Sequence, residues 1–356
     1  MDRYHRQSLL PQIGPAGRAR LAASRVVLVG VGALGTHIAE QLVRAGVGYL
    51  RIVDRDIVEL TNLQRQVLFD ETHAATGWPK AAAAAERLAA INSEVVVDAR
   101  IADVHAGNIK EIIGEGFQIS NLKFEISNPQ SSPPSLLLDG TDNVTTRYLL
   151  NDFAVKHAIP WIYGACVGVE GRVMAVRPGE SPCLRCIFPT PPRPEDLATC
   201  DTAGVLGSAA AVVASLQVVA AIRLLIAAPP QDELLSMNLW SSRFHRLPLT
   251  DARRPECPCC GLRQFEFLNR PPGESTATLC GRDAVQIRGE RPVDLEEFDA
   301  RWQPLGTVER NRFFIRCHLT DPVTIRLTLF ADGRLIVQGT RDPARAKSLY
   351  ARFVGA

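Results

Sequence analysis

Two groups of residues in this sequence have the types and spacing needed for chemistry. The first begins with glycines at positions 30, 32 and 35, between a β-branched run and an amphipathic segment. Glycines in a strand–turn–helix unit let the backbone approach a phosphate, and the helix N-terminus offers it free N–H groups. Asp54 ends the next apolar run, at the spacing expected for an acid that binds a ribose. The stretch 26–65 therefore predicts a nucleotide-binding unit.

Further polar residues follow the strand that ends at Asp54 and a later strand that ends at Asp139. They are Asp56, Asn62, Arg65, Gln66, Lys80, Asp142 and Asn143. Strand ends at one edge of a parallel sheet meet at the ligand crevice, so we expect these groups to meet. Lys80 and Arg65 would neutralise a departing pyrophosphate, and Asp142 would hold Mg²⁺. This set favours ATP over NAD, because an NAD enzyme needs an apolar nicotinamide pocket.

Each of these residues also has a simpler explanation when it is taken alone. Arg65 would more often be a solvated surface cation, Asp142 could cap the helix that follows it, and Lys80 could merely begin a helix. The glycine turn by itself would also allow an NAD(P)-dependent oxidoreductase or a non-catalytic nucleotide fold.

Cysteines form the second group. Cys183 and Cys186 make one C-x-x-C pair, and Cys257, Cys259 and Cys260 make a second cluster. Two such pairs suit tetrahedral coordination of Zn²⁺ by four thiolates, which leaves no open position and so favours a structural role. The alternative is two unrelated cysteine turns or redox pairs. The long gap between the pairs means that a metal would join distant segments rather than fold a local finger.

Size and composition indicate an ordinary soluble protein. The chain has 356 residues, of which 46% are hydrophobic and 22% charged, and its net charge is +2. This balance gives no field that would attract nucleic acid or an acidic membrane. No apolar signal segment follows the first residues, and the nine cysteines suit a reducing compartment. We therefore expect a cytoplasmic protein with no nucleic-acid or membrane partner.

Strands alternate with helices over the first half, which predicts a Rossmann-like, doubly wound and mostly parallel sheet with a terminal antiparallel portion. Two of its strands are expected to turn around Glu170-Gly171, and Pro79 is expected at the first position of a helix. The segment 106–113 reads as a helix. The predicted organisation is an ATP-binding domain over 1–269 with an exposed insertion at 115–135, a linker at 270–275, and a small α+β domain over 276–356.

The segment 203–228 is long and apolar enough to require a membrane check. It reads AGVLGSAAAVVASLQVVAAIRLLIAA, which could span a bilayer by length alone. Its many small residues, Gln217 and Arg223 favour a helix buried in a core or a subunit interface. We predict a buried helix, with membrane contact as the alternative.

Eight motifs then occur in one order: RYHRQ, GVGALG, DRDIVELTNLQRQ, GWPKA, DGTDNVTTRYLLN, PCLRC, TCDTAGVLG and CPCCG. In these motifs, residues 1–267 closely resemble the ThiF/MoeB/HesA family, bacterial relatives of ubiquitin-activating enzymes. The resemblance implies ATP- and Mg²⁺-dependent adenylation of the C-terminal Gly-Gly carboxylate of a small ubiquitin-like sulfur carrier such as ThiS or MoaD. Activation for conjugation through a thioester is the alternative within the family.

The resemblance also implies residue roles. The nucleotide and magnesium set would be Gly32, Asp54, Asn62, Arg65, Lys80, Asp142 and Asn143. Arg6 would reach the phosphates of the opposite subunit, since the family works as a homodimer. Cys257 and Cys260 are selected as the second zinc pair. Cys200 matches a position where some members bind the carrier covalently, with an idle loop cysteine as the alternative. Residues 276–356 show no rhodanese pattern, so a separate sulfur donor is expected.

Overall fold

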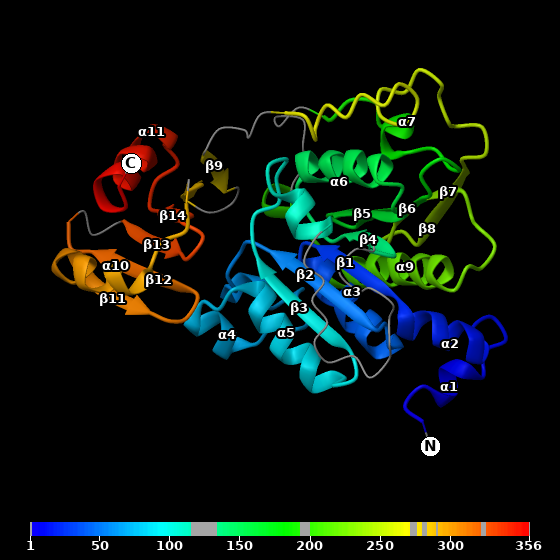
Figure 1. Ribbon diagram of the computed structural model, residues 1–356, viewed down its shortest axis with the longest axis horizontal. Coiled ribbons are helices and arrows are strands. Elements are labelled where there is room, and N and C mark those ends of the chain that lie inside the picture. The colour runs from blue at the N-terminus through cyan, green and yellow to red at the C-terminus, as the bar shows by residue number, and fades with distance from the viewer. Residues whose placement is uncertain are drawn as a thin grey trace. The chain divides into compact units, whose positions relative to one another are not determined.

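A computed structural model describes residues 2–114, 134–192, 200–270, 276–279, 283–289, 291–321 and 325–355. The predicted insertion at 115–135 and the predicted linker at 270–275 lie almost entirely outside the described residues. The chain divides into two compact units, Met1–Pro271 and Pro272–Ala356 (Figure 1).

The first unit is built on an eight-stranded sheet of order β3-β2-β1-β4-β5-β6-β7-β8. Its strands are β1 (Arg25–Val29), β2 (Tyr49–Asp54), β3 (Val96–Ile101), β4 (Leu136–Asp139), β5 (Trp161–Val167), β6 (Glu170–Val176), β7 (Glu233–Asn238) and β8 (Arg243–Pro248). The pairings from β3 to β5 are parallel, and those from β5 to β8 are antiparallel. The predicted fold class is confirmed.

Helices cover both faces of this sheet, because its central strands are apolar on both sides. Val26 and Leu28 of β1 share one core with α3 (Ala33–Ala45), α5 (Lys80–Ile91) and α9 (Gly207–Leu225). Val27 and Val29 share a second core with α6 (Val144–Lys156). The remaining helical elements are α1 (His5–Ser8), α2 (Gly14–Ala23), a 3-10 turn (Leu60–Asn62), α4 (Glu71–Thr76), a π-type turn (Lys110–Gly114), α7 (Leu184–Ile187) and α8 (Cys200–Ala203).

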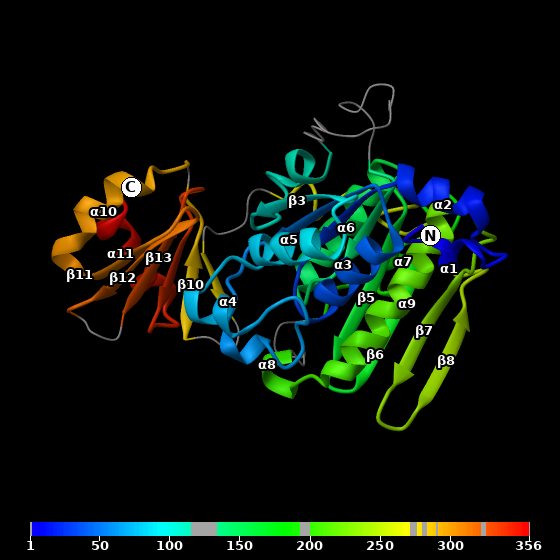
Figure 2. The ribbon, with the colours of Figure 1, turned by 90° about the horizontal axis from the view of Figure 1, so that it is seen from below.

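Among the described helices, α9 alone is long and apolar enough to cross a membrane. Figure 2 shows it lying along β5 and β6. Small residues permit this close approach: a Cβ at Gly171 would lie 2.2 Å from Val213, and one at Gly164 would lie 2.1 Å from Gln217. The helix buries one face in the core, as its composition predicts, while Val219 is 56% exposed.

Three local predictions in the first unit differ from the structure in position. The turn between β5 and β6 lies at residues 168–169, because a two-residue hairpin loop needs a positive φ and Gly168 supplies one, at +60°. Pro79 is the N-cap of α5, which begins at Lys80. The helix predicted over 106–113 lies nearer the C-terminus: a π-helix covers Lys110–Gly114, and Arg51 of β2 donates to the carbonyl of Ile112 within it.

The second unit is a small α+β domain. Its antiparallel sheet has the order β11-β12-β13-β14-β10-β9, and α10 (Leu295–Trp302) and α11 (Pro343–Phe353) share an apolar core with it. The strands are β9 (Thr276–Leu279), β10 (Ala284–Ile287), β11 (Gly306–Arg310), β12 (Phe314–Leu319), β13 (Arg326–Phe330) and β14 (Leu335–Gln338). Strand β11 has little strand signal in its sequence, because Val308 is its single apolar residue.

Candidate nucleotide site and metal centre

The glycine turn between β1 and α3 packs against the loop that follows β4. Gly30 has a φ of +90°, and a Cβ there would lie 2.6 Å from the carbonyl carbon of Gly140. A Cβ at Gly35 would lie 1.9 Å from the oxygen of Gly30, so the fold itself requires both glycines. Gly32 differs: its φ is −92°, and the nearest atom to a Cβ there, Nε2 of Gln66, is 3.9 Å away. The fold leaves room above Gly32 for a ligand.

Two further observations indicate an anionic ligand at this turn. Gly32 is the N-cap of α3 and provides no side-chain hydrogen bond to the first N–H groups of the helix. Gln66 is 3% exposed, and its amide nitrogen Nε2, which can donate hydrogen bonds, is the nearest atom to the Cβ position of Gly32, at 3.9 Å. An uncapped helix N-terminus binds anions well, and an amide N–H can donate to a phosphate oxygen. The residues present therefore fit a phosphate group.

Asp54 is fixed beside the glycine turn. Its two carboxylate oxygens accept hydrogen bonds from the backbone N–H of Val31 and that of Asp56, both at 2.7 Å. Burial raises the pKa of Asp54, and the positive charge of Lys80 acts against that rise. Nζ of Lys80 is 3.2 Å from Oδ2 of Asp56, and Lys80 is 5% exposed. The structure thus brings Asp54, Asp56 and Lys80 together. Lys80 is the first residue of α5 and also a buried partner in an ion pair.

The loop after β4 is held by a buried ion pair. Nε of Arg147 lies 3.0 Å from Oδ2 of Asp139, whose other carboxylate oxygen accepts from the N–H of Thr141 at 2.8 Å. Nη2 of Arg147 donates to the carbonyl of Thr141 at 2.5 Å. Burial raises the pKa of Asp139, whereas Arg147 opposes this rise. These contacts brace the backbone that leads to Asp142.

Asn143, and not Asp142, caps α6. Its side-chain oxygen accepts a hydrogen bond from the N–H of Thr146 at 2.9 Å. Asp142 is exposed and accepts no hydrogen bond from any residue that the structure describes. Because a carboxylate oxygen is a good ligand for Mg²⁺, the chemistry of Asp142 fits the predicted metal role. The capping explanation of Asp142 is therefore wrong.

Other predicted residues have structural contacts of their own. Asn62 is 2% exposed, and its side-chain oxygen accepts from the N–H of Glu59 at 3.1 Å. Arg65 donates to the carbonyl of Thr61 at 2.7 Å, on the loop that also carries Gln66. Cys200 begins α8, and its side chain lies outside the described residues.

Arg6 lies away from the glycine turn of its own chain. It is an exposed residue of α1. The neighbouring Gln7 donates to the carbonyl of Ala45 at 3.2 Å, at the C-terminal end of α3. The glycine turn is at the other end of that helix, which is about 20 Å long. The structure does not bring Arg6 to the other predicted site residues of the same chain.

Arg55 and Asp103 were missed by the sequence reasoning. Nη1 of Arg55 is 3.1 Å from Oδ1 of Asp103, and its Nε is 3.9 Å from Oδ1 of Asp56. Burial acts to lower the pKa of Arg55, but the carboxylates of Asp103, Asp56, Asp142 and Asp54 together raise it. The rule that functional residues follow parallel strands would have found both residues, since Arg55 follows β2 and Asp103 follows β3.

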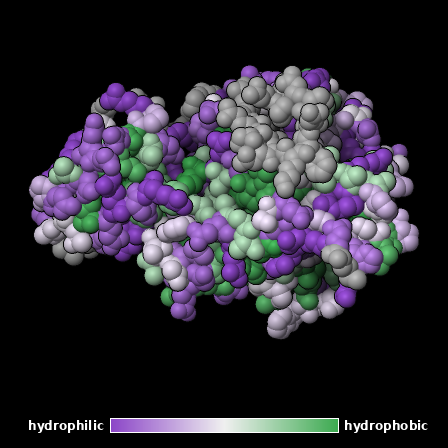
Figure 3. All heavy atoms as spheres, turned by 60° about the horizontal axis from the view of Figure 1, so that its bottom comes forward, coloured by the Kyte–Doolittle hydropathy of each residue, from purple (hydrophilic) through white to green (hydrophobic). Residues whose placement is uncertain are grey.

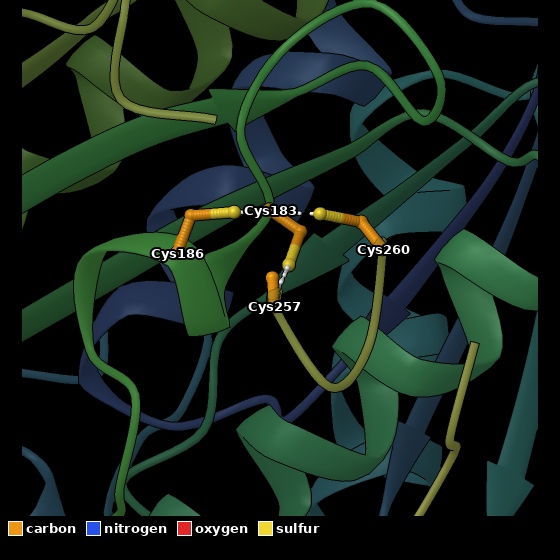
Figure 4. A group of neighbouring side chains, drawn as sticks. All are labelled: Cys183, Cys186, Cys257 and Cys260. Atoms are coloured by element: carbon orange, nitrogen blue, oxygen red, sulfur yellow. Dashed lines mark hydrogen bonds between the residues drawn. The ribbon is translucent and has the colours of Figure 1, made fainter. Parts of the chain in front are cut away.

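The four predicted zinc ligands form one cluster. The Sγ atoms of Cys183, Cys186, Cys257 and Cys260 lie within 4.8 Å of one another (Figure 4). Two of the S···S distances are 3.6 Å and 3.3 Å. Zn–S bonds of about 2.3 Å require S···S distances of about 3.8 Å in a tetrahedron, so the cluster fits zinc. Hydrogen bonds from Cys183 and Cys260 lower the pKa of the Cys186 thiol.

Cys259 is outside this cluster. Its sulfur accepts a hydrogen bond from Nδ2 of Asn151 at 3.2 Å. Oδ1 of Asn151 accepts from the N–H of Leu184 at 2.9 Å, so one side chain of α6 holds both cysteine segments. The interpretation of two unrelated cysteine turns is wrong, because the segments meet in the fold.

A cavity of about 530 Å³ lies at the opposite edge of the sheet, where residues such as Ser24, Ser135 and Pro160 precede strands. Its cations already have partners: Arg177 binds both carboxylate oxygens of Asp232, at 2.9 Å and 2.8 Å, and Arg20 donates to a backbone carbonyl. It contains none of the predicted nucleotide residues.

This fold and site define the class of Rossmann-like enzymes that bind a nucleotide and carry a separate four-cysteine centre. The model of the ThiF family matches residues 4–259, and the chain belongs to that family. It is 41% identical over 356 residues to the sulfur carrier protein ThiS adenylyltransferase of Bacillus subtilis (strain 168), covering 99% of both chains. It is therefore an adenylyltransferase of this family, as the motifs implied.

Two further proteins are similar to this chain, one in sequence and one in fold. The chain is 40% identical over 268 residues to the sulfur carrier protein adenylyltransferase of Thermus thermophilus, covering 73% of this chain and 91% of that one. The crystal structure of Escherichia coli MccB with ATP has a similar fold, with a TM-score of 0.59, 20% identity, and coverage of 73% of this chain and 75% of that one.

Proposed function

We propose that this protein uses ATP and Mg²⁺ to adenylate the C-terminal Gly-Gly carboxylate of a small ubiquitin-like sulfur carrier. The observation that carries the proposal is the convergence of the glycine turn, Asp54, Lys80 and the braced Asp142 loop at one sheet edge. The names of the Bacillus and Thermus relatives support this substrate. The activated carrier would then receive sulfur for thiamine, molybdopterin or a related product.

The chemistry needs positioning and charge rather than a base. A carboxylate oxygen of the carrier attacks the α-phosphorus, the bond to the bridging oxygen of the β-phosphate breaks, and pyrophosphate leaves. The carboxylate is already ionised at pH 7, so no proton has to be removed from it. The N–H groups above Gly32 would bind phosphate, and Lys80 and Arg65 would stabilise the charge on the departing group.

The remaining polar residues would hold the nucleotide. Asp54 would accept from the ribose hydroxyls, and the buried amide of Gln66 would face the phosphates. Mg²⁺, held by Asp142 with phosphate oxygens and waters, would neutralise further charge. Zn²⁺ in the four-cysteine centre would be structural, because four thiolates leave no open position.

A homodimer is part of the proposal. Arg6 is distant from the site of its own chain, so it would serve the site of a second copy. Large apolar side chains are exposed in the arm that carries Arg6 and near the site loop: Leu9, Leu10, Leu60, Val67 and Leu206. Figure 3 shows one face of the protein, on which hydrophobic residues are interspersed with hydrophilic ones. Burying exposed leucines in a subunit interface would stabilise a dimer.

After adenylation, Cys200 would form a covalent bond with the carrier if the route passes through a thioester or an acyl-disulfide. A separate protein would be needed as the sulfur donor. The free cysteines suit the reducing conditions of a cytoplasm.

Exchange of labelled pyrophosphate into ATP tests this function. We expect exchange only when a Gly-Gly-ended carrier such as ThiS or MoaD is present, and its loss in Asp142→Asn with an unchanged melting temperature. Absence of exchange with every such carrier would reject adenylation, and turnover of NADH would favour an oxidoreductase. A carrier adduct that is sensitive to thiols and absent in Cys200→Ser would favour a covalent route.

A further inference from the structure

An ion pair lies at the same sheet edge as the glycine turn and Asp54. Nη1 of Arg55 is 3.1 Å from Oδ1 of Asp103, and the two side chains are 28% and 18% exposed. The pair joins the loop after β2 to the loop after β3. Strands β2 and β3 stay paired up to the residues just before Arg55 and Asp103: the N–H of Ala102 donates to the carbonyl of Asp54 at 3.2 Å.

The loop that carries Asp103 is held by its own hydrogen bonds. Nδ2 of Asn108 donates to the carbonyl of Asp103, and the N–H of His105 donates to Oδ1 of Asn108, both at 2.8 Å. The N–H of Gly107 donates to Nδ1 of His105 at 3.1 Å. A carboxylate on such a braced loop can contact a ligand without a large ordering cost.

The order of strands places this pair beyond the ribose position. In nucleotide sites of this type, phosphates bind at the glycine turn after β1, and the ribose binds at the acid that ends β2. The base then lies further along the edge, over the loops that follow β2 and β3. We propose that Arg55 and Asp103 form the base subsite and select adenine. This inference rests on the proposed binding of ATP at this edge.

Adenine suits the two side chains chemically. It carries a donating amino group at position 6, where guanine and hypoxanthine carry an accepting oxygen. The ionised Asp103 carboxylate only accepts hydrogen bonds, so it would bind the amino group and repel the oxygen. The planar guanidinium of Arg55, kept charged by the surrounding carboxylates, would stack on the base.

Calorimetry on the full-length protein without carrier tests the subsite, with ATP and ITP as probes. The variants are Arg55→Met, Asp103→Asn and the double variant, which removes both charges and leaves neither unpaired. Arg100→Met is the matched control, because Arg100 lies on β3, is 47% exposed and pairs with Asp98 rather than with Asp103. Melting temperatures show that each variant is folded.

We expect Arg55→Met to weaken ATP binding about tenfold, the effect of losing a partly buried cation–π contact. Asp103→Asn should reduce the preference for ATP over ITP about tenfold, since an amide can donate to an oxygen as well as accept. The double variant should show both losses, and Arg100→Met neither.

Two results overturn the inference. Either the wild type fails to distinguish ATP from ITP, or the folded Arg55 and Asp103 variants bind both nucleotides as Arg100→Met does. Carrier-dependent exchange is measured separately. A wild type that selects ATP through these residues without any exchange would refute adenylation and keep the base subsite.

Discussion

Arg147 and Asp139 form an ion pair of 3.0 Å in which the carboxylate is fully buried. Arg147 also donates to the carbonyl of Thr141, and Gln217 of α9 donates to the carbonyl of Asp139 at 2.8 Å. The loop that ends in Asp142 is therefore fixed from both sides, by α6 and by α9. A carboxylate that must share a metal with a nucleotide gains from such bracing, because the loop does not have to be ordered on binding.

Replacing Arg147 should disturb this loop more than the fold. Arg147→Lys keeps the positive charge but loses the two-pronged contact with Asp139 and Thr141. We expect the Mg²⁺ concentration that gives half-maximal pyrophosphate exchange to rise about tenfold, with a smaller change in ATP binding. Lys156→Met, at the exposed end of α6, should change neither quantity. An unchanged Mg²⁺ requirement in a folded Arg147→Lys protein would contradict the positioning role.

The glycines of the turn should separate into structural and functional positions. Gly30→Ala should lower the stability by about 1–3 kcal/mol or more, because its φ is +90° and its Cβ would overlap the Gly140 backbone. Gly32→Ala should cost less stability than Gly30→Ala: its φ is −92° and the nearest atom outside its chain neighbours is 3.9 Å from its Cβ position, although its ψ of −142° lies outside the usual β range.

The second glycine variant should instead weaken nucleotide binding. A methyl group above Gly32 would occupy the space for phosphate, so we expect a rise of about tenfold or more in the dissociation constant for ATP, measured by calorimetry. Normal ATP affinity in Gly32→Ala would place the phosphates elsewhere.

Metal analysis should find about one zinc per chain, as expected for four thiolates that lie within 4.8 Å of one another. Cys260→Ser should lose the zinc and lower the melting temperature by several degrees, because the metal joins two distant segments. Cys259→Ser is the matched control next to it: its sulfur contacts Asn151, so the zinc content should stay unchanged. Wild-type protein without zinc would refute the assignment.

The stability of the first unit should fall in acid through Asp98. Burial acts to raise the pKa of Asp98, but hydrogen bonds and charge from Tyr49, Arg51 and Arg100 lower it below its ordinary value. A lowered carboxylate pKa stabilises the fold above the unfolded pKa of about 3.9, and this contribution is lost as the pH falls through the folded value.

The measurement is the free energy of unfolding between pH 6 and pH 2.5. Asp98→Asn should be less stable than the wild type at pH 6 by about 1–3 kcal/mol, since Arg51 is 1% exposed and loses a charged partner. The difference between the two proteins should shrink below about pH 4. A constant difference over this range would show that Asp98 does not titrate between the folded and unfolded states as stated.

Local sequence was sufficient for the elements that carry the site. The apolar runs before Gly30, Asp54 and Asp139 predict strands that are buried on both faces, and glycine or acid marks each strand end. The eight motifs were sufficient for the family. These signals are local: each depends on residues that are neighbours in sequence, so they can be recognised without knowledge of the packing.

Tertiary structure decided the contacts between residues far apart in the chain. It placed Asn143 rather than Asp142 at the helix cap, paired Arg55 with Asp103, and moved a hairpin turn to Gly168. It also placed Arg6 at the far end of α3. Such outcomes depend on strand register, loop paths and burial, which are set by many simultaneous contacts. The residue types and their spacing in the sequence therefore determined which chemistry the chain can carry out. The packing of the fold decided which of those side chains are placed to perform it.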